Sequence, residues 1–343
     1  MWSSKKPTTL LKFAALTTIS FVLFSDNLVP TMVEEISNDL RMSSDTERTF
    51  FPVSMLNGSV EEIRNISRRW IDTLPSQYDR AQFDKGMNNH SHDRFFPFRE
   101  IVSCLDVQEV GRSPRTPKGS FDDLSKFVCG INSFRFQNGH CIVYSIGGNN
   151  QWAFEKDLLK KTSCEVHTFD CTGPRSRFKK PNSDRLFFHH ICMENKYKPA
   201  SNDCRGRHKC GKSMTLAEIQ AELGHDTVDI LKIDIEGFEV PIIQSWWRNK
   251  QNKNFNLPRQ LLMELHYSTF PHFSRELKES YLKNFSSDCF FSDKNRVFQT
   301  ATDMVTLQMM LLEMGYVVSV YDGDTKCPHC VELSLVRLPL NLY

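Results

Sequence analysis

Asp170, Asp234 and His266 each stand directly after an apolar run of strand length. Ligands bind at the carboxyl ends of the strands in open α/β sheets, so these three positions are candidates for binding and catalysis. A carboxylate there can accept hydrogen bonds from ligand hydroxyls. A carboxylate or a neutral imidazole can also take a proton from a reacting group. The three positions therefore predict a crevice that binds a hydroxyl-bearing ligand and contains a base.

A fourth apolar run, residues 141–146, leads into Gly147, Gly148 and Asn149. The glycines predict a strand that ends in a turn whose backbone can approach a ligand closely, although a tight turn without a ligand would use the same residues. Asp170 follows about one helix later. This order predicts the first half of a doubly wound sheet that holds a nucleotide-like ligand, with Asp170 accepting hydrogen bonds from the ribose hydroxyls. Helix capping is the alternative for Asp170.

Glu236 and Gly237 follow Asp234 where the strand gives way to a turn. Asp234 and Glu236 are two residues apart, so they leave the same face of the strand unless the turn before Gly237 redirects one of them. We predict Asp234 or His266 as the base, with Glu236 as a further catalytic candidate. A buried, satisfied histidine is the alternative for His266. We expect no metal, although carboxylates and an imidazole can bind a divalent cation and these three residues are the alternative ligand set.

From residue 141 onward, apolar runs of strand length alternate with helical segments. This alternation predicts an α/β fold with a doubly wound, mostly parallel sheet and helices on both faces. Thr215 and Glu218 have the spacing of a capping box before a helix that Gly224 stops. The expected strands are residues 141–146, 164–169, 186–191, 228–233 and 260–265, followed by a terminal antiparallel hairpin at 316–321 and 331–338. Seven strands in this layout form the Rossmann-like sheet of class I methyltransferases.

Four motifs occur in order at these strand ends: Ser-Ile-Gly-Gly-Asn at 145–149, His-Thr-Phe-Asp at 167–170, Leu-Lys-Ile-Asp-Ile-Glu-Gly-Phe-Glu at 231–239, and Met-Glu-Leu-His at 263–266. Together they resemble the FkbM-type branch of S-adenosylmethionine-dependent methyltransferases, and still more a secretory-pathway methyltransferase-like group of eukaryotes. The resemblance covers residues 96–343. Two positions depart from the family pattern, because Ser145 stands where the family usually has Asp and Gln151 where it has Gly.

The resemblance implies S-adenosylmethionine as the cofactor and methyl transfer to a hydroxyl of a glycan or small molecule. It implies that six residues bind the cofactor: Ser145, Gly147, Gly148, Asn149, Asp170 and Asp234. It also implies that the end of the fourth strand lies beside the sulfonium and the acceptor. Methyl transfer needs alignment and a base. A catalytically silent binding domain is the alternative, which the departure at Ser145 favours. A nicotinamide-dependent oxidoreductase is a third option, but the loop lacks Gly-x-Gly-x-x-Gly.

Residues 13–24 form an apolar core that follows Lys5 and Lys6. This pattern predicts a signal anchor or a signal peptide within residues 1–25. An anchor would make a single-pass protein of the Golgi or endoplasmic reticulum with a lumenal C-terminal domain; a cleaved peptide would make it secreted. Residues 26–95 are polar, carry one patch of helical spacing at residues 60–74, and are expected to form a lumenal stem. Four sequons agree with a lumenal glycoprotein, at Asn57, Asn65, Asn89 and Asn284.

The net charge of +2 is dispersed along the chain, so we expect no nucleic-acid partner. The 11 cysteines favour an oxidising compartment and leave at least one thiol unpaired if the others form disulfides. Cys104 and Cys129 flank a loop rich in Pro, Gly and Arg, and we expect a disulfide there, with two buried thiols as the alternative. Cys327 and Cys330 favour a structural disulfide or a turn over a redox motif. Residues 175–180 indicate a solvated loop or a docking patch for an anionic acceptor.

Overall fold

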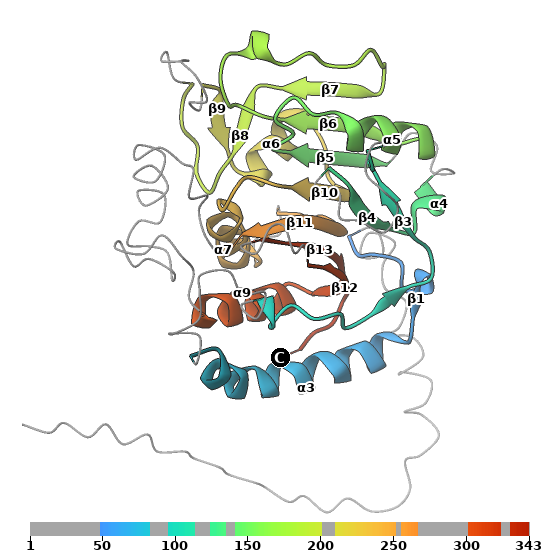
Figure 1. The fold of residues 1–343 in the computed structure, drawn as a ribbon, viewed down its shortest axis with the longest axis vertical. Helices are drawn as coiled ribbons and strands as arrows, with labels where there is room; N and C mark the ends of the chain where they lie inside the picture. Colours follow the sequence, from blue (N-terminus) through green and yellow to red (C-terminus); the bar gives the residue numbers. More distant parts are fainter. Residues whose placement is uncertain are drawn as a thin grey trace, which may run out of the picture. The chain divides into compact units, whose positions relative to one another are not determined.

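The computed structural model describes residues 49–82, 95–113, 124–134, 141–200, 210–251, 255–266, 301–323 and 330–342. They belong to one compact unit, residues 44–343. A seven-stranded sheet with the order β12-β13-β11-β10-β5-β6-β7 forms its centre (Figure 1). The strands are β5 (Ile142–Ile146), β6 (Glu165–Phe169), β7 (Leu186–His189), β10 (Ile230–Ile233), β11 (Gln260–His266), β12 (Tyr316–Asp322) and β13 (Cys330–Arg337).

The pairing of these strands confirms the predicted α/β fold. The pairs β5–β6, β6–β7, β5–β10 and β10–β11 are parallel. β13 runs antiparallel to both β11 and β12, which makes the terminal hairpin. The expected third strand, at 186–191, differs: the sheet strand ends at His189, and residues Ile191–Met193 form a separate strand, β8, that pairs with β9 (Lys212–Met214).

Helices cover both faces of the sheet. α5 (Ala153–Lys161) buries Phe154 and Leu158 in a cluster with β5 and β6. On the other face, α6 (Leu216–Leu223), α7 (Glu239–Asn249) and α9 (Ala301–Glu313) share the largest apolar cluster. α6 begins with the predicted capping box of Thr215 and Glu218 and ends at Gly224, which has a φ of 70°. The local signals for α6 were therefore sufficient to place both of its ends.

The N-terminal part of the described chain departs from the expected stem. α3 (Val60–Gln82) has the predicted helical spacing, but its stripe is buried and belongs to the folded unit. Ile63, Trp70 and Leu74 pack in one cluster with Val317 and Val336 of the C-terminal strands. Those partners lie more than 200 residues further along the chain, so sequence spacing alone did not reveal them. The folded unit therefore begins well before residue 96.

The short elements complete the unit. The strands are β1 (Leu56–Asn57), which pairs with β2 (Ser103–Cys104), and β3 (Val107–Val110), which pairs with β4 (Lys126–Cys129). The short helices are η1 (Val53–Met55), α4 (Ile131–Phe134) and η4 (Arg175–Arg177). β4 lies against the sheet: the backbone N–H of Cys129 donates to the side chain of Gln260 at 2.7 Å. This contact places Lys126 of β4 over the ends of β11 and β13.

Disulfides join neighbouring elements of the fold. The predicted Cys104–Cys129 bond is confirmed. Two further bonds were not predicted, Cys141–Cys164 and Cys171–Cys192. Cys330 is also disulfide-bonded, whereas Cys327 lies outside the described residues. Such bonds are consistent with a protein of the secretory pathway.

Within the described ranges, no helix is both long and apolar enough to span a bilayer. The predicted anchor, residues 13–24, lies outside those ranges, as do the sequons at Asn89 and Asn284. Asn57 and Asn65 are exposed to solvent.

Candidate functional site

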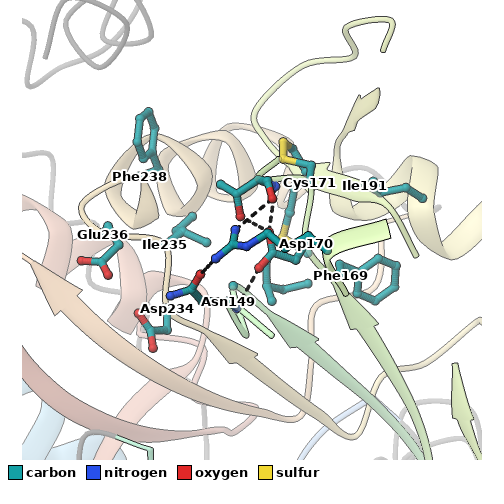
Figure 2. Close-up of a pocket in the computed structure, with 15 residues that line it drawn as sticks. Asn149, Phe169, Asp170, Cys171, Ile191, Asp234, Ile235, Glu236 and Phe238 are labelled. Carbon is teal, nitrogen blue, oxygen red and sulfur yellow. Dashed lines mark hydrogen bonds between the residues drawn. A yellow bond between two sulfur atoms is a disulfide. The ribbon is translucent and has the colours of Figure 1, made fainter. Parts of the chain in front are cut away.

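A pocket of about 180 Å³ opens at the carboxyl ends of β5, β6 and β10. It is lined by five of the predicted site residues: Gly147, Asn149, Asp170, Asp234 and Glu236. Figure 2 shows Asp170 beside Asn149 on one side of the pocket and Asp234 and Glu236 on the other. The fold thus brings together motifs that lie up to 89 residues apart, at the edge of the sheet where the sequence predicted a crevice.

Asp170 ties the glycine turn to the end of β6. Its Oδ2 accepts the backbone N–H of Asn149 at 2.8 Å, and its Oδ1 accepts the backbone N–H of Thr172 at 2.8 Å and the Thr172 hydroxyl. A carboxylate offers about four acceptor positions, so these three bonds leave about one, on Oδ2. Asp170 can therefore take one strong hydrogen bond from a ligand without losing a contact.

Gly147 is required by the packing of the chain itself. Its φ is 85°, and a Cβ built on it would lie 1.7 Å from the carbonyl oxygen of Asp234. The end of β10 thus fills the space on the Cβ side of Gly147, while the rest of this residue lines the pocket. Gly148 is different, because a Cβ there would meet only ordinary contacts, the nearest at 3.4 Å. Asn149 and Asn150 continue the turn with positive φ values of 44° and 64°.

Ser145 is fully buried and is absent from the residues that line the pocket. It faces α5, where its hydroxyl donates to Oε1 of Glu155 at 2.6 Å. Burial raises the pKa of Glu155, although the ammonium of Lys232 opposes this. A carboxylate from α5 therefore lies against position 145, where the resembling family carries an acid. Glu155 was not predicted, and its signal was an acidic residue on the apolar stripe of a helix.

Asp234 is the partly accessible carboxylate at the end of β10, with 19% of its side chain exposed. Its Oδ2 lies 3.7 Å from Nζ of Lys232. Burial alone would raise the pKa of Asp234, but the positive charges of Lys232, Lys126 and His266 hold it below its ordinary value. Asp234 is therefore ionised at neutral pH and can accept a proton or a hydrogen bond in the pocket.

His266 is fully buried and stands among three carboxylates. Its Nδ1 lies 3.5 Å from Oε1 of Glu239, and its Nε2 lies 3.5 Å from Oε1 of Glu264 and 3.6 Å from Oε2 of Glu236. Burial lowers the pKa of His266, but Glu239, Glu264 and Glu236 outweigh it and raise the pKa to about 10. His266 is therefore an imidazolium at neutral pH.

This protonation state argues against the predicted role of His266 as a base. An imidazolium has no lone pair for a proton or a metal ion. The raised pKa also opposes the metal alternative of Asp234, Glu236 and His266, because an ion would have to displace this proton. Cys330 also lies within 4.8 Å of Glu264 and His266, but its disulfide leaves no thiolate to bind an ion.

Six charged residues form what we call the ionic cluster: Lys126, Lys232, Asp234, Glu264, His266 and Glu332. Lys126 binds the carboxylate of Glu332 and lies 3.9 Å from Glu264. Burial raises the pKa of Glu332 to about 7 against the attraction of Lys126. Burial and two neighbouring carboxylates raise the pKa of Glu264 well above its ordinary value. The cluster fixes several charges beside the pocket.

Glu239 shapes the turn that presents Glu236. It is fully buried, and its Oε1 accepts the backbone N–H groups of Ile235 at 2.9 Å and Gly237 at 3.2 Å. Glu236 adopts a φ of 61°, which is uncommon for a residue other than glycine, and 49% of its side chain is exposed. The turn therefore begins at Glu236, and both Asp234 and Glu236 line the pocket.

Arg177 of η4 also lines the pocket. Its guanidinium donates to the carbonyl oxygen of Thr172 at 3.0 Å and to the side-chain oxygen of Asn149. The sequence indicated only a solvated loop or docking patch for residues 175–180. The structure shows that one member of that stretch lines the pocket.

A protein-family model described as "Methyltransferase domain" matches residues 55–317. The chain belongs to this methyltransferase family. It is an S-adenosylmethionine-dependent methyltransferase by family. The start of the match, inside the predicted stem, agrees with the packing of α3 on the domain.

Individual proteins are more distantly similar to this methyltransferase. "Probable methyltransferase-like protein 24" of Homo sapiens is 25% identical over 112 residues, which are 32% of this chain and 29% of the human protein. A mutant 16S rRNA (adenine-N(1))-methyltransferase from Catenulisporales acidiphilia has a TM-score of 0.34 at 11% identity and covers 59% of this chain and 86% of its own. The phosphoethanolamine N-methyltransferase 2 of Haemonchus contortus, in complex with S-adenosyl-L-methionine, has a TM-score of 0.26 at 10% identity and covers 54% and 35%.

Proposed function

We propose that the pocket binds S-adenosylmethionine and that the protein methylates a hydroxyl group. One observation carries this proposal: Asp170 and Asp234, from the ends of β6 and β10, line the same pocket on opposite sides of the glycine turn. Asp170 offers its remaining acceptor position to a ribose hydroxyl. The turn at Gly147 and Asn149 offers backbone groups to the methionine part. Asp234 and Glu236 then lie on the side where an acceptor approaches the sulfonium.

The proposed reaction transfers the methyl group in one displacement. The acceptor oxygen attacks the methyl carbon, the carbon–sulfur bond breaks, and S-adenosylhomocysteine leaves. The oxygen becomes strongly acidic as its bond to carbon forms, so an ionised carboxylate is a sufficient proton acceptor even when its pKa is low. Asp234 is such a carboxylate, and Glu236 is the second candidate. His266 stabilises both negative charges as an imidazolium.

The acceptor and the compartment are also part of the proposal. We propose an FkbM-type enzyme that acts on a glycan or another hydroxyl-bearing molecule in the secretory pathway, and not on nucleic acid. The disulfides and the exposed sequons at Asn57 and Asn65 support a lumenal domain. Residues 1–25 would anchor it in a Golgi or endoplasmic reticulum membrane or be cleaved to release it.

The alternative is a silent binding domain with the methyltransferase fold. The serine at position 145 favours this alternative, whereas the Glu155 carboxylate beside it and the accessible Asp234 favour an enzyme. Calorimetry of the purified protein with S-adenosylmethionine and with NAD separates these functions. The enzyme is expected to bind only the first and to transfer its labelled methyl group to secretory glycans or small alcohols. Binding of neither cofactor would leave the binding domain as the better description.

A further inference from the structure

A second group of histidines lies on the α6 face of the sheet, away from the ionic cluster. Glu165 and His167 point to the same face of β6 because they are two residues apart, and Oε1 of Glu165 lies 2.7 Å from Nε2 of His167. His225 reaches them from just beyond the end of α6. One ligand atom from each of these three residues lies within 4.8 Å of the other two. We call Glu165, His167 and His225 the histidine site.

The second nitrogen of each ring already has a partner. Nδ1 of His167 lies 2.9 Å from Nε2 of His189, and Nδ1 of His225 lies 2.8 Å from the hydroxyl of Tyr144. Histidines that bind metal ions commonly use one ring nitrogen for the ion and the other for such a hydrogen bond, which fixes the tautomer and the orientation of the ring. The partners therefore fix the orientation of both rings, and an ion at Nε2 of His167 would replace the proton that this nitrogen shares with Glu165.

The site is open to solvent on one side. The Glu165 side chain is 38% exposed, so an ion can reach the site from solvent.

We propose that Glu165, His167 and His225 bind one divalent transition-metal ion, with zinc as the best-fitting ion. Two imidazole nitrogens and one carboxylate form a known zinc ligand set, with water in the fourth position. The bound ion would take the place of the proton between Glu165 and His167, and small side-chain movements would bring the ligands to bonding distance. It would join β6 to the end of α6, elements that are about 60 residues apart in sequence.

The histidine site is separate from the proposed chemistry. It lies toward the beginning of β6, whereas the pocket lies beyond its end. The connection between the two is Phe169, which lines the pocket and stacks on His189 with ring centroids 4.7 Å apart. Metal binding can therefore be measured whether or not the protein transfers methyl groups.

The test uses untagged full-length protein with its disulfides intact, stripped of metal by a chelator. Zinc chloride is titrated in the calorimeter, and cobalt chloride is added in a parallel sample to record the visible absorption of a low-symmetry site. We expect one ion per chain and a rise in melting temperature with zinc. His225→Gln and Glu165→Gln should each weaken zinc binding at least roughly 10- to 100-fold. These two residues are partly exposed, so their variants are suited to remain folded when His167→Gln is not.

Glu222→Gln is the matched control. Glu222 acts electrostatically on His189 but is outside the three-residue ligand set, so the variant removes a nearby negative charge and keeps the ligands. It should bind zinc within about threefold of the wild type, on the scale of a surface charge. The proposal is overturned if the wild type binds no zinc at micromolar concentration. It is also overturned if His225→Gln and Glu165→Gln, both folded by circular dichroism, bind as the wild type does or lose no more than Glu222→Gln.

Discussion

Two histidine-containing groups on the same sheet have opposite charge states. His266, in the ionic cluster, has a pKa raised to about 10, whereas His189, beside the histidine site, has a pKa lowered to about 4. Burial lowers the pKa of both histidines. The difference comes from neighbours, because His266 stands 3.5 to 3.6 Å from three carboxylates and His189 stands beside another histidine. The number of carboxylates around a histidine thus sets the direction of its pKa shift: three surround His266, whereas His189 has another histidine as its nearest charged neighbour.

Loss of the imidazolium should have the largest effect on stability. His266→Gln removes the positive charge from a fully buried group of carboxylates and leaves the buried Glu239 without the imidazolium beside it. We expect the free energy of unfolding to fall by about 3–5 kcal/mol, as for a broken buried ion pair. His225→Gln, without metal, should change it by less than about 1 kcal/mol. Urea denaturation of both variants measures the contrast, and equal losses would show that the two regions do not differ in this way.

Loss of the Asp234 charge should affect catalysis without a comparable effect on cofactor binding. Asp234→Asn keeps the size of the side chain but removes the proton acceptor. We expect methyl transfer to fall by about 10² or more, the scale of a lost general base. Asp184→Asn is the control, because Asp184 is exposed and is not among the pocket residues. Unchanged transfer by Asp234→Asn would move the base to Glu236.

The pH dependence of stability should separate the regions further. The folded-state pKa of His266 is raised from 6.5 to about 10, so its stabilising effect is complete below about 6.5 and is lost as the pH rises through 10. Between pH 7 and 10, we expect this residue to lower the free energy of unfolding by at most about 1.4 kcal/mol per pH unit. The His266→Gln variant should show a flatter dependence. An identical slope in wild type and variant would contradict the raised pKa.

The sequence was sufficient for elements that local patterns determine. The strands, the capping box at Thr215 and the order of the hairpin follow from residue periodicity and turn chemistry, and the structure has them. Asp170 and Asp234 were found because parallel strands end at one edge of a sheet. These features need only the sequence near each residue.

Features that depend on distant partners were missed. The apolar stripe of α3 could be read from the sequence, but the residues it packs against, such as Val317 and Val336, could not. Glu332 interrupts an apolar strand and Lys126 begins another, and each was a usable signal for a buried ion pair. The protonation state of His266 depends on Glu239, which belongs to α7. The turn before α7 determines the orientation of Glu239, and the sequence alone did not reveal that turn.

The most direct test of the cofactor site compares a ligand and its two deoxy analogues on the wild type and on an Asp170 variant. S-adenosylhomocysteine and its 2′-deoxy and 3′-deoxy analogues are titrated by calorimetry into the wild type and into Asp170→Ala. The analogues matter because Asp170 also holds Asn149 and Thr172, so the variant alone cannot separate ribose binding from the shape of the turn. Asp184→Ala is the control for the loss of an acidic side chain.

We expect the wild type to bind one deoxy analogue more weakly than the parent ligand by about 1.5–3 kcal/mol, or roughly 10- to 150-fold, because one charge-assisted hydrogen bond is lost. Asp170→Ala should bind the parent and that analogue equally well. The Asp184→Ala control should keep the wild-type preference. If folded Asp170→Ala still prefers the parent ligand by the wild-type factor, Asp170 does not hold the ribose.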